Sequence, residues 1–318
     1  MSDRMNTEKL GDLVTALVEA GRRAGADAAD AVVMQSRSSS VSVRLGKVES
    51  TDSSENDAVA LRVFVGGRVA SVSASSGADI AVLAERAVAM AKASPEDPFQ
   101  GLADPAELTA EFPDLDLLDA AAPASEQLRA DALAAEEAAL AVKGVTNSGG
   151  SSASAGLGGL VLATSNGFFG HYAATRFSRA ASVIAGEGTA MERDYDFSSR
   201  LHWSDLDPAE EIGRRAGERA VRRLGARKAG SGPITVVCDP RVARGIAGHL
   251  ASAINGAAVA RKTSFLRDRM GKPVAGAAIT VTDAPRRVRG PSSRPFDGEG
   301  VAGETLVMVE KGVLAHWF

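Results

Sequence analysis

The sequence predicts an α+β protein in which an N-terminal helix, an antiparallel meander and a second helix are followed by a second, mainly antiparallel β domain with helices. Apolar residues recur at helical spacing over residues 7–24 and 78–92. Between these stretches, apolar and polar side chains alternate, as they do in half-buried antiparallel strands. This order indicates an α+β unit rather than a βαβ unit. We place the domain boundary after residue 120, which gives an N-terminal α+β domain at 1–120 and a second domain at 121–318.

Composition supports a globular protein of two domains. The chain has 318 residues, of which 45% are apolar and only 4% aromatic, so its cores must consist mainly of aliphatic side chains. A formal net charge of −4 argues against a surface that attracts nucleic acid everywhere. The single cysteine, Cys238, excludes a disulfide within the chain and suits a reducing compartment. No signal peptide and no membrane-length apolar run is present, so we expect a cytoplasmic protein.

The N-terminal half reads as two helices around short strands. Gly25 is a stop signal for the first helix. About five short stretches with alternating side chains follow, and Gly66-Gly67 marks a hairpin between two of them. The proline-containing segment 94–98 ends the second helix.

The middle of the chain predicts a connection, a helix and more strands. Residues 99–124 are acidic and contain prolines, which is typical of a surface connection. A helix follows at 125–142, and its spacing predicts that Glu136 and Glu137 point outward. The segment 144–160 is rich in Gly and Ser but contains no phosphate-binding motif, so we expect strands and turns of small residues.

Another hairpin and a basic helix come next. Ser165-Asn166-Gly167 marks a turn before a strand at 169–185. The helix at 207–224 begins with acidic residues, with Glu210 expected at its third position, and ends with basic ones, which complements its dipole.

The basic residues of this region are the best argument for a nucleic-acid site. They are Arg214, Arg215, Arg219, Arg222, Arg223, Arg227, Lys228, Arg286, Arg287, Arg289 and Arg294. No aromatic residues are interleaved for base stacking, and no binding motif accompanies them. We therefore favour a solvated basic face over nucleic-acid contact.

A strand and a helix are predicted at 234–257. Residues 234–238 read as an apolar strand, which would bury the thiol of Cys238. Asp239-Pro240 fits a helix start, because Asp caps well and Pro suits the first helical position. Val242 and Ile246 begin a stripe that we expect to face a core. His249 lies between this stripe and a strip of small residues.

The remaining sequence predicts short strands and turns. A strand is expected over 279–283, and 305–309 and 313–318 form an apolar hairpin. The acidic segment 296–300 is a turn, since its two carboxylates are too few for a calcium site.

The segments 238–266 and 293–318 resemble the TldD/PmbA family, whose members include metallopeptidase subunits once named modulators of DNA gyrase. In the TldD branch the corresponding helix carries an HExxxH zinc motif. This chain has Arg-Gly-Ile-Ala-Gly-His at 244–249, so Arg244 replaces the first zinc histidine, Gly245 replaces the catalytic glutamate, and only His249 matches. Neither replacement provides a ligand or a general base. The resemblance therefore points to the PmbA (TldE) branch.

The resemblance implies a PmbA/TldE-like subunit that joins a TldD-like protein to cut peptides or unfolded proteins. We expect no catalytic residue, no metal ligand and no cofactor in this chain, and zinc in the TldD-type partner. The candidates for contact with the peptide or the partner are Arg244, His249, Arg261, Lys262 and Phe265. A homodimer is possible when the chain is isolated. Family members continue past residue 318, and an edge strand ending in Trp317-Phe318 would be unpaired, so we expect a truncated C-terminus.

Two alternatives stay open. One is a nucleic-acid-associated or gyrase-associated regulatory binding protein that uses the arginine-rich helix. The other is a homodimeric peptidase that takes ligands from the expected further C-terminal part. No other chemistry is apparent, since the four histidines have no His, Cys or Glu partner at zinc-helix spacing and no G-x-S-x-G motif is present.

Overall fold

The computed structural model describes residues 7–318. The predicted absence of a signal peptide concerns a segment that lies largely outside this range. The helices are α1 Thr7–Arg23, α2 Ile80–Ala93, α3 Ser125–Leu140, α4 Ala209–Arg222, α5 Pro240–Ala253 and α6 Gly256–Ala260. The strands are β1 Ala28–Arg44, β2 Lys47–Val65, β3 Arg68–Ser75, β4 Val145–Thr164, β5 Phe169–Ala185, β6 Glu192–Arg200, β7 Val281–Asp283, β8 Leu306–Glu310 and β9 Val313–Leu314. No helix within the described range is both long and apolar enough to cross a bilayer.

The chain divides into two compact units, one comprising the chain through Ala226 with Arg287–Ala302, the other Arg227–Arg286 with Gly303–Phe318. The first unit is built on an antiparallel sheet of order β3-β2-β1-β4-β5-β6. This sheet takes three strands from each side of residue 120, and the domain boundary there stays a prediction. The α+β class is confirmed.

The strands of the first unit are fewer and longer than the short stretches expected from the sequence, since β1, β2 and β4 have 17, 19 and 20 residues. The apolar alternation of β1 lapses between Met34 and Val41, where its residues are largely exposed. A strand needs alternation only where one face is buried. The short alternating stretches predicted from the sequence therefore correspond to the two ends of each long strand, where helices cover one face.

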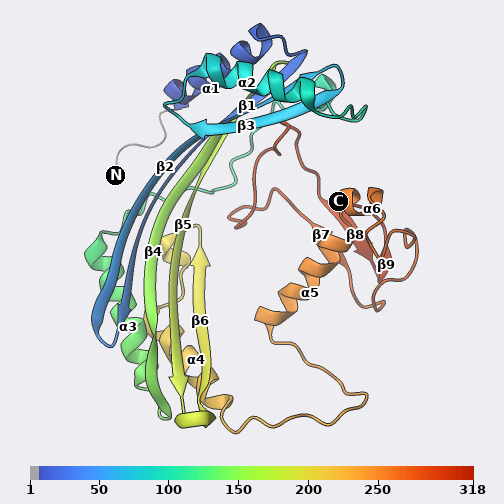
Figure 1. Cartoon of the computed structure of the whole chain (residues 1–318). Coiled ribbons are helices and arrows are strands. Elements are labelled where there is room, and N and C mark those ends of the chain that lie inside the picture. The colour runs from blue at the N-terminus through green and yellow to red at the C-terminus, as the bar shows by residue number, and fades with distance from the viewer. Residues whose placement is uncertain (1–6) are drawn as a thin grey trace. The chain divides into compact units, whose positions relative to one another are not determined.

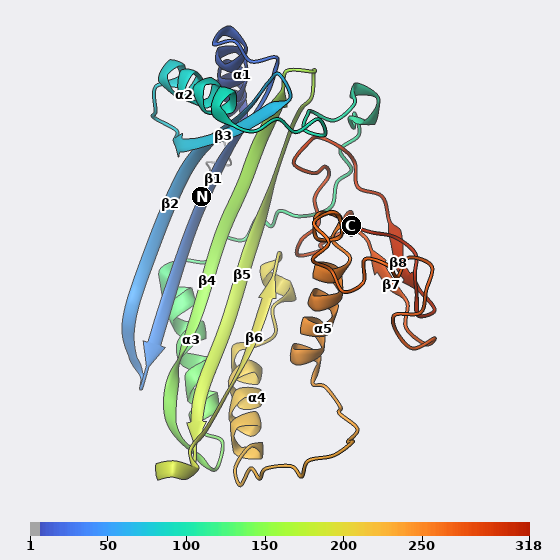
Figure 2. The same cartoon turned by 45° about the vertical axis from the view of Figure 1, so that its right-hand side comes forward.

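Helices cover one face of the sheet at both ends of the strands, as Figure 1 and Figure 2 show from two directions. Helix α1 packs on Ala31 and Val33 of β1, α2 packs on β2 and β3, and α3 packs on Val41 and Val43 of β1. These four residues lie an even number of positions apart and so point to the same face. Helices α3 and α4 further cover β5 through an alanine-rich core. The opposite face carries Asp30, and the smaller of the two cavities described below lies on this face.

The segment Arg287–Ala302, here called the anchor segment, returns from the second unit to pack in the first. Phe296 is 1% exposed, and its ring makes edge contacts with Phe168 at 5.0 Å and Tyr172 at 5.3 Å between centroids. The acidic turn predicted at 296–300 is confirmed, because the Asp297 carboxylate accepts the backbone N–H of Glu299 at 2.9 Å and of Val301 at 3.0 Å. The anchor segment is thus fixed by an aromatic cluster and a closed turn.

The second unit is small and differs from expectation around α5. Asp239 caps α5 as predicted, accepting from the Arg241 N–H at 2.9 Å. However, the apolar strand predicted before it is wrong, because residues 234–238 pair with no strand in the described chain and Val237 is 91% exposed. Cys238 is half-buried rather than buried.

The core-facing stripe of α5 is also wrong over most of its length. Val242 and Ile246 are 62% and 60% exposed. Only the C-terminal end of the helix, with Ala253 and the following Ile254, joins a core, which it shares with the β8–β9 hairpin. The hairpin prediction is confirmed, with a shorter second strand than expected.

Replacing Leu45 by asparagine should stabilise the first unit by about 1 kcal/mol. Leu45 and Gly46 form the β1–β2 turn with φ angles of 51° and 74°. Two positive φ angles define a type I′ turn, which favours Asn-Gly and strains leucine. Leu45 is 57% exposed, so little packing is lost. Urea unfolding would measure the gain in stability. The control variant Leu45→Ala keeps the strained turn and should show no gain. Equal unfolding midpoints for Leu45→Asn and wild type would contradict this account.

Candidate functional site

All five contact candidates predicted from the sequence lie exposed on the second unit. Arg244 and His249 are both on α5, five positions apart, which separates their side chains by about 140° around the helix axis. The helix therefore does not bring these two side chains to one face. Arg261, Lys262 and Phe265 follow α6, and the Phe265 ring is 80% exposed.

Local hydrogen bonds order the chain after α6. The Asn255 carboxamide caps α6 by accepting from the Ala257 and Ala258 N–H groups at 3.0 and 3.3 Å. Lys262 has a φ of 60°, and its N–H donates to the Val259 carbonyl at 2.9 Å. An ordered backbone holds Phe265 in the exposed position, although nothing in this unit covers its ring.

The residues of α5 do not fit a zinc ion. A zinc site of this kind needs neutral imidazoles and a general base close together. The helix instead presents a guanidinium at Arg244, no side chain at Gly245 and one exposed imidazole at His249. Among residues 7–318, no group of three or more His, Cys, Asp or Glu side chains is arranged to hold a metal.

Three of the four arginines of α4, all except Arg222, are paired with carboxylates among the described residues. Arg214 contacts Glu211 at 2.6 Å and Glu218 at 2.5 Å. The further pairs are Arg215 with Asp196 and Asp207, Arg219 with Asp196, Arg223 with Glu192 and Asp194, and, in the anchor segment, Arg289 with Asp116 and Asp205. Because most of its arginines are neutralised locally, the helix offers little of the unmatched positive charge that phosphate contacts require. These pairs weigh against a nucleic-acid site on this helix.

The start of α4 also differs from the predicted cap. The helix begins at Ala209, no side chain caps it, and the Asp207 carboxylate instead accepts a hydrogen bond from Arg215 at 2.5 Å. This hydrogen bond holds the pKa of Asp207 below its ordinary value.

Stability should therefore fall on acidification partly through Asp207. Its folded pKa is lower than its unfolded pKa, so its contribution is complete above the unfolded value of about 3.9 and is lost as the pH falls through the folded value. Asp207→Asn should be less stable than wild type at pH 7, and the two should converge towards pH 2. Urea midpoints measured across this range test the prediction; parallel curves for the two proteins would contradict it.

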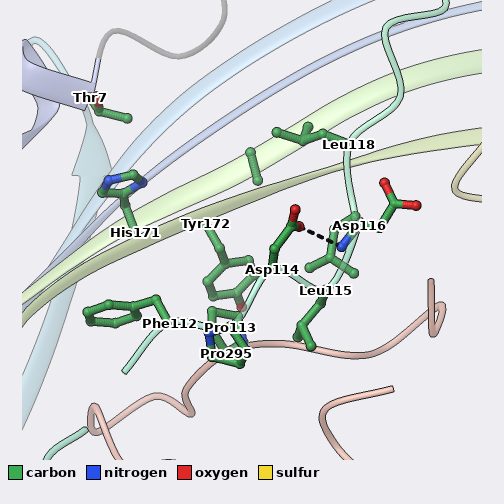
Figure 3. A pocket seen from close by; sticks show the side chains of 12 residues that line it. Thr7, Phe112, Pro113, Asp114, Leu115, Asp116, Leu118, His171, Tyr172 and Pro295 are labelled. Carbon is green, nitrogen blue, oxygen red and sulfur yellow. Dashed lines mark hydrogen bonds between the residues drawn. The ribbon is translucent and has the colours of Figure 1, made fainter. Parts of the chain in front are cut away.

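Two cavities of the first unit share Tyr172 of β5 in their lining. The larger has a volume of about 540 Å³, and Figure 3 shows Tyr172 of β5 beside the segment that carries Phe112 and Pro113, while His171 points to the other side, towards Thr7 of α1. Leu115 and Leu117 of that segment are 5% and 7% exposed, so the predicted surface connection is partly a buried strap. The Asp114 carboxylate accepts the Asp116 N–H at 2.8 Å and is thus turned to its own backbone (Figure 3).

The smaller cavity, about 380 Å³, combines an apolar floor with charged walls. It is lined by Asp30, Val32, Met34, Ala60, Arg62, Ser71, Leu160, Leu162, Tyr172, Arg294, Asp297, Gly298 and Glu299. Asp30 and Arg62 lie opposite each other on β1 and β2 and pair at 2.7 Å. Burial raises the pKa of Asp30 even though Arg62 lowers it. Sequence reasoning missed this cavity, although a charged residue within the apolar run around Asp30 was a usable signal.

Three protein-family models match most of the chain. They are described as PmbA/TldA metallopeptidase domain 1, the central domain and the C-terminal domain, at residues 29–91, 118–224 and 231–318.

Curated relatives and solved structures agree with these matches. The chain is 35% identical to metalloprotease PmbA of Escherichia coli O157:H7 over 92% of its own length and 65% of the relative's, and 34% identical to a PmbA homolog of Haemophilus influenzae over 96% and 68%. A structure from Bacteroides thetaiotaomicron, described as a modulator of DNA gyrase, matches with a TM-score of 0.92 and 30% identity over 99% of this chain and 72% of that one. TldE from Thermococcus kodakarensis shares the fold, with a TM-score of 0.76 and 19% identity over 96% and 69%.

Proposed function

Because the chain belongs to the PmbA/TldE family of metallopeptidase-type proteins, we propose that it acts as a PmbA/TldE-like subunit of a TldD-type metallopeptidase complex that cuts peptides or unfolded proteins. One observation supports assigning catalysis to the partner and binding to this chain. The helix that would bear a zinc motif in a TldD-type protein has Arg244 and Gly245 at the positions of a ligand and a general base. The predicted cytoplasmic location is part of the proposal.

In this complex the TldD-type partner supplies the zinc and the base that activate water. The residues of this chain bind the partner and orient the peptide. Val242 and Ile246 offer apolar surface on α5 for a partner, since side chains left this exposed gain free energy when another protein covers them. Arg244, His249, Arg261, Lys262 and Phe265 remain the candidates for contact with the peptide or the partner. The guanidinium and ammonium groups among them suit the carbonyl oxygens and carboxylates of a peptide.

The proposal is tested by co-purifying the full-length protein with a TldD-type protein that carries HExxxH. We expect a complex with one zinc per pair, peptide hydrolysis by the complex, and neither zinc nor hydrolysis with the full-length protein alone. Ile246→Asp should weaken the complex, whereas Val82→Asp, at a similarly exposed site on α2 of the first unit, should not. Stoichiometric zinc and peptidase activity in the full-length protein alone would contradict the proposal.

The nucleic-acid alternative predicts a different result in the same preparations. Phosphate contacts release counterions, so DNA affinity would fall steeply between 50 and 200 mM salt, by about 10³-fold or more for a protein making several such contacts. The carboxylate partners of the arginines on α4 lead us to expect no such binding.

A further inference from the structure

The smaller cavity of the first unit has a floor suited to an apolar group. Val32 and Met34 of β1 and Leu160 and Leu162 of β4 line it, and Met34 is 42% exposed. Its volume of about 380 Å³ lies within the range of small-ligand sites, about 300–1,000 Å³. A space of this size has room for a large aliphatic side chain and for the backbone that carries it.

The carboxylates around this floor already have partners. Asp30 accepts from the Arg62 guanidinium at 2.7 Å, and Glu299 lies 3.6 Å from the same guanidinium. The Asp297 carboxylate accepts the two N–H groups that close the turn of the anchor segment. The acceptors of the cavity are therefore satisfied within the protein.

Two residues of the same cavity carry hydrogen-bond donors that have no acceptor among the described residues. Tyr172 and Arg294 both line it, and within residues 7–318 neither the hydroxyl of the first nor the guanidinium of the second has a hydrogen bond or an ion pair. They lie close enough for the positive charge of Arg294 to lower the pKa of Tyr172, although burial raises that pKa overall. A guanidinium and a hydroxyl that line one cavity and have no acceptor in the protein can both donate to a carboxylate.

The geometry points to a subsite for the C-terminal carboxylate of a peptide whose last side chain is apolar. Arg294 and Tyr172 would donate to the carboxylate, while the aliphatic floor would hold the side chain. The choice of a peptide rests on the proposed function, whereas the affinity for an apolar carboxylate rests on the cavity alone. Tyr172 is kept in place by its edge contact with Phe296, so the hydroxyl is pre-positioned by the anchor segment.

Calorimetry on the full-length protein tests this subsite with N-acetyl-Leu-Leu, its C-terminal amide and hexanoate. We expect the acid to bind at least about tenfold more tightly than the amide, as for a charge-assisted hydrogen bond, and more tightly than hexanoate. Arg294→Gln should abolish the difference between acid and amide, and Tyr172→Phe, which keeps the ring packing, should reduce it. Arg227→Gln, in an exposed stretch of the second unit, is the matched control and should bind as wild type does.

Several outcomes would overturn the subsite. Equal binding of acid and amide, no binding of either, or an unchanged preference in a folded Arg294→Gln variant would each exclude it. Hexanoate binding as tightly as the dipeptide acid would exclude a peptide as the ligand. The titrations need neither the partner nor zinc, so a negative result here leaves complex formation untouched, and a failure to form the complex leaves these titrations interpretable.

Discussion

Glu136→Ala is expected to lower the free energy of unfolding by about 3 kcal/mol, because it removes the acceptor of three hydrogen bonds at once. The Glu136 side chain is on α3 and is 2% exposed. Its carboxylate accepts the N–H groups of Leu45 and Gly46, each at 2.8 Å, and the hydroxyl of Ser148. Without it, the strained β1–β2 turn loses its support, and the buried Ser148 hydroxyl loses the acceptor of its hydrogen bond. Urea unfolding of the full-length protein would measure the loss.

The neighbouring Glu137 provides the control for Glu136. It lies on the same helix but is exposed. Glu137→Ala should change the free energy of unfolding by less than about 0.5 kcal/mol, as surface substitutions usually do. Glu136→Gln, which keeps one acceptor oxygen, should fall between the two. Similar losses for Glu136→Ala and Glu137→Ala would show that the turn does not depend on this carboxylate.

Gly213→Ala should destabilise the first unit by about 3 kcal/mol, the upper end of what overpacking usually costs. In an exposed helix, the same substitution would gain about 1 kcal/mol. Here a β-carbon on Gly213 of α4 would lie 1.9 Å from the carbonyl oxygen of Ala135 on α3. That oxygen belongs to helix backbone, so only a separation of the two helices could relieve the overlap. The effect is measured as a lower thermal midpoint and a smaller free energy of unfolding.

Gly245 of α5 is the matched control for Gly213, because a β-carbon on Gly245 would meet no neighbouring atom within 4 Å. Gly245→Ala should therefore be neutral or raise the stability of its helix, so of the two identical substitutions only Gly213→Ala should destabilise the protein. A Gly213→Ala variant as stable as wild type would mean that α3 and α4 do not pack as closely as described.

Much of the helical structure could be predicted because each helix carries its own signals. Apolar spacing places α1 and α2, and the Asp239-Pro240 cap places the start of α5. The hairpin between β4 and β5 follows from Ser165-Asn166-Gly167. These features depend on neighbours close in sequence, which a single sequence displays directly.

The parts that could not be predicted depend on neighbours far away in sequence. Glu136 was expected to point outward, but it is buried because the turn after β1, about 90 residues earlier in the chain, brings two N–H groups to it. The continuity of β1 through its polar middle depends on pairing with β2 and β4 on both sides. Apolar residues at 234–238 resemble a buried strand, yet in this structure no described strand pairs with them.

The candidate sites show the same difference between features set by neighbours close in sequence and features set by distant ones. Family resemblance selected residues on and after α5, and the structure places them on an exposed surface of one unit without joining Arg244 and His249 on one face. The cavity around Arg294 and Tyr172 is assembled from strands β1 to β5 and the anchor segment. Its residues are scattered along the chain from Asp30 to Glu299, so no local sequence motif predicts the cavity.

The path of the anchor segment has a consequence for cleavage. The backbone passes between the two compact units at three points, after Ala226, Arg286 and Ala302. A protease that nicks the exposed stretch near Gly230 would therefore leave two fragments that do not part in native buffer, since the later fragment stays fastened to the earlier one through the buried ring of Phe296. The nick would become visible only on a denaturing gel, while gel filtration would still return a single species of unchanged mass.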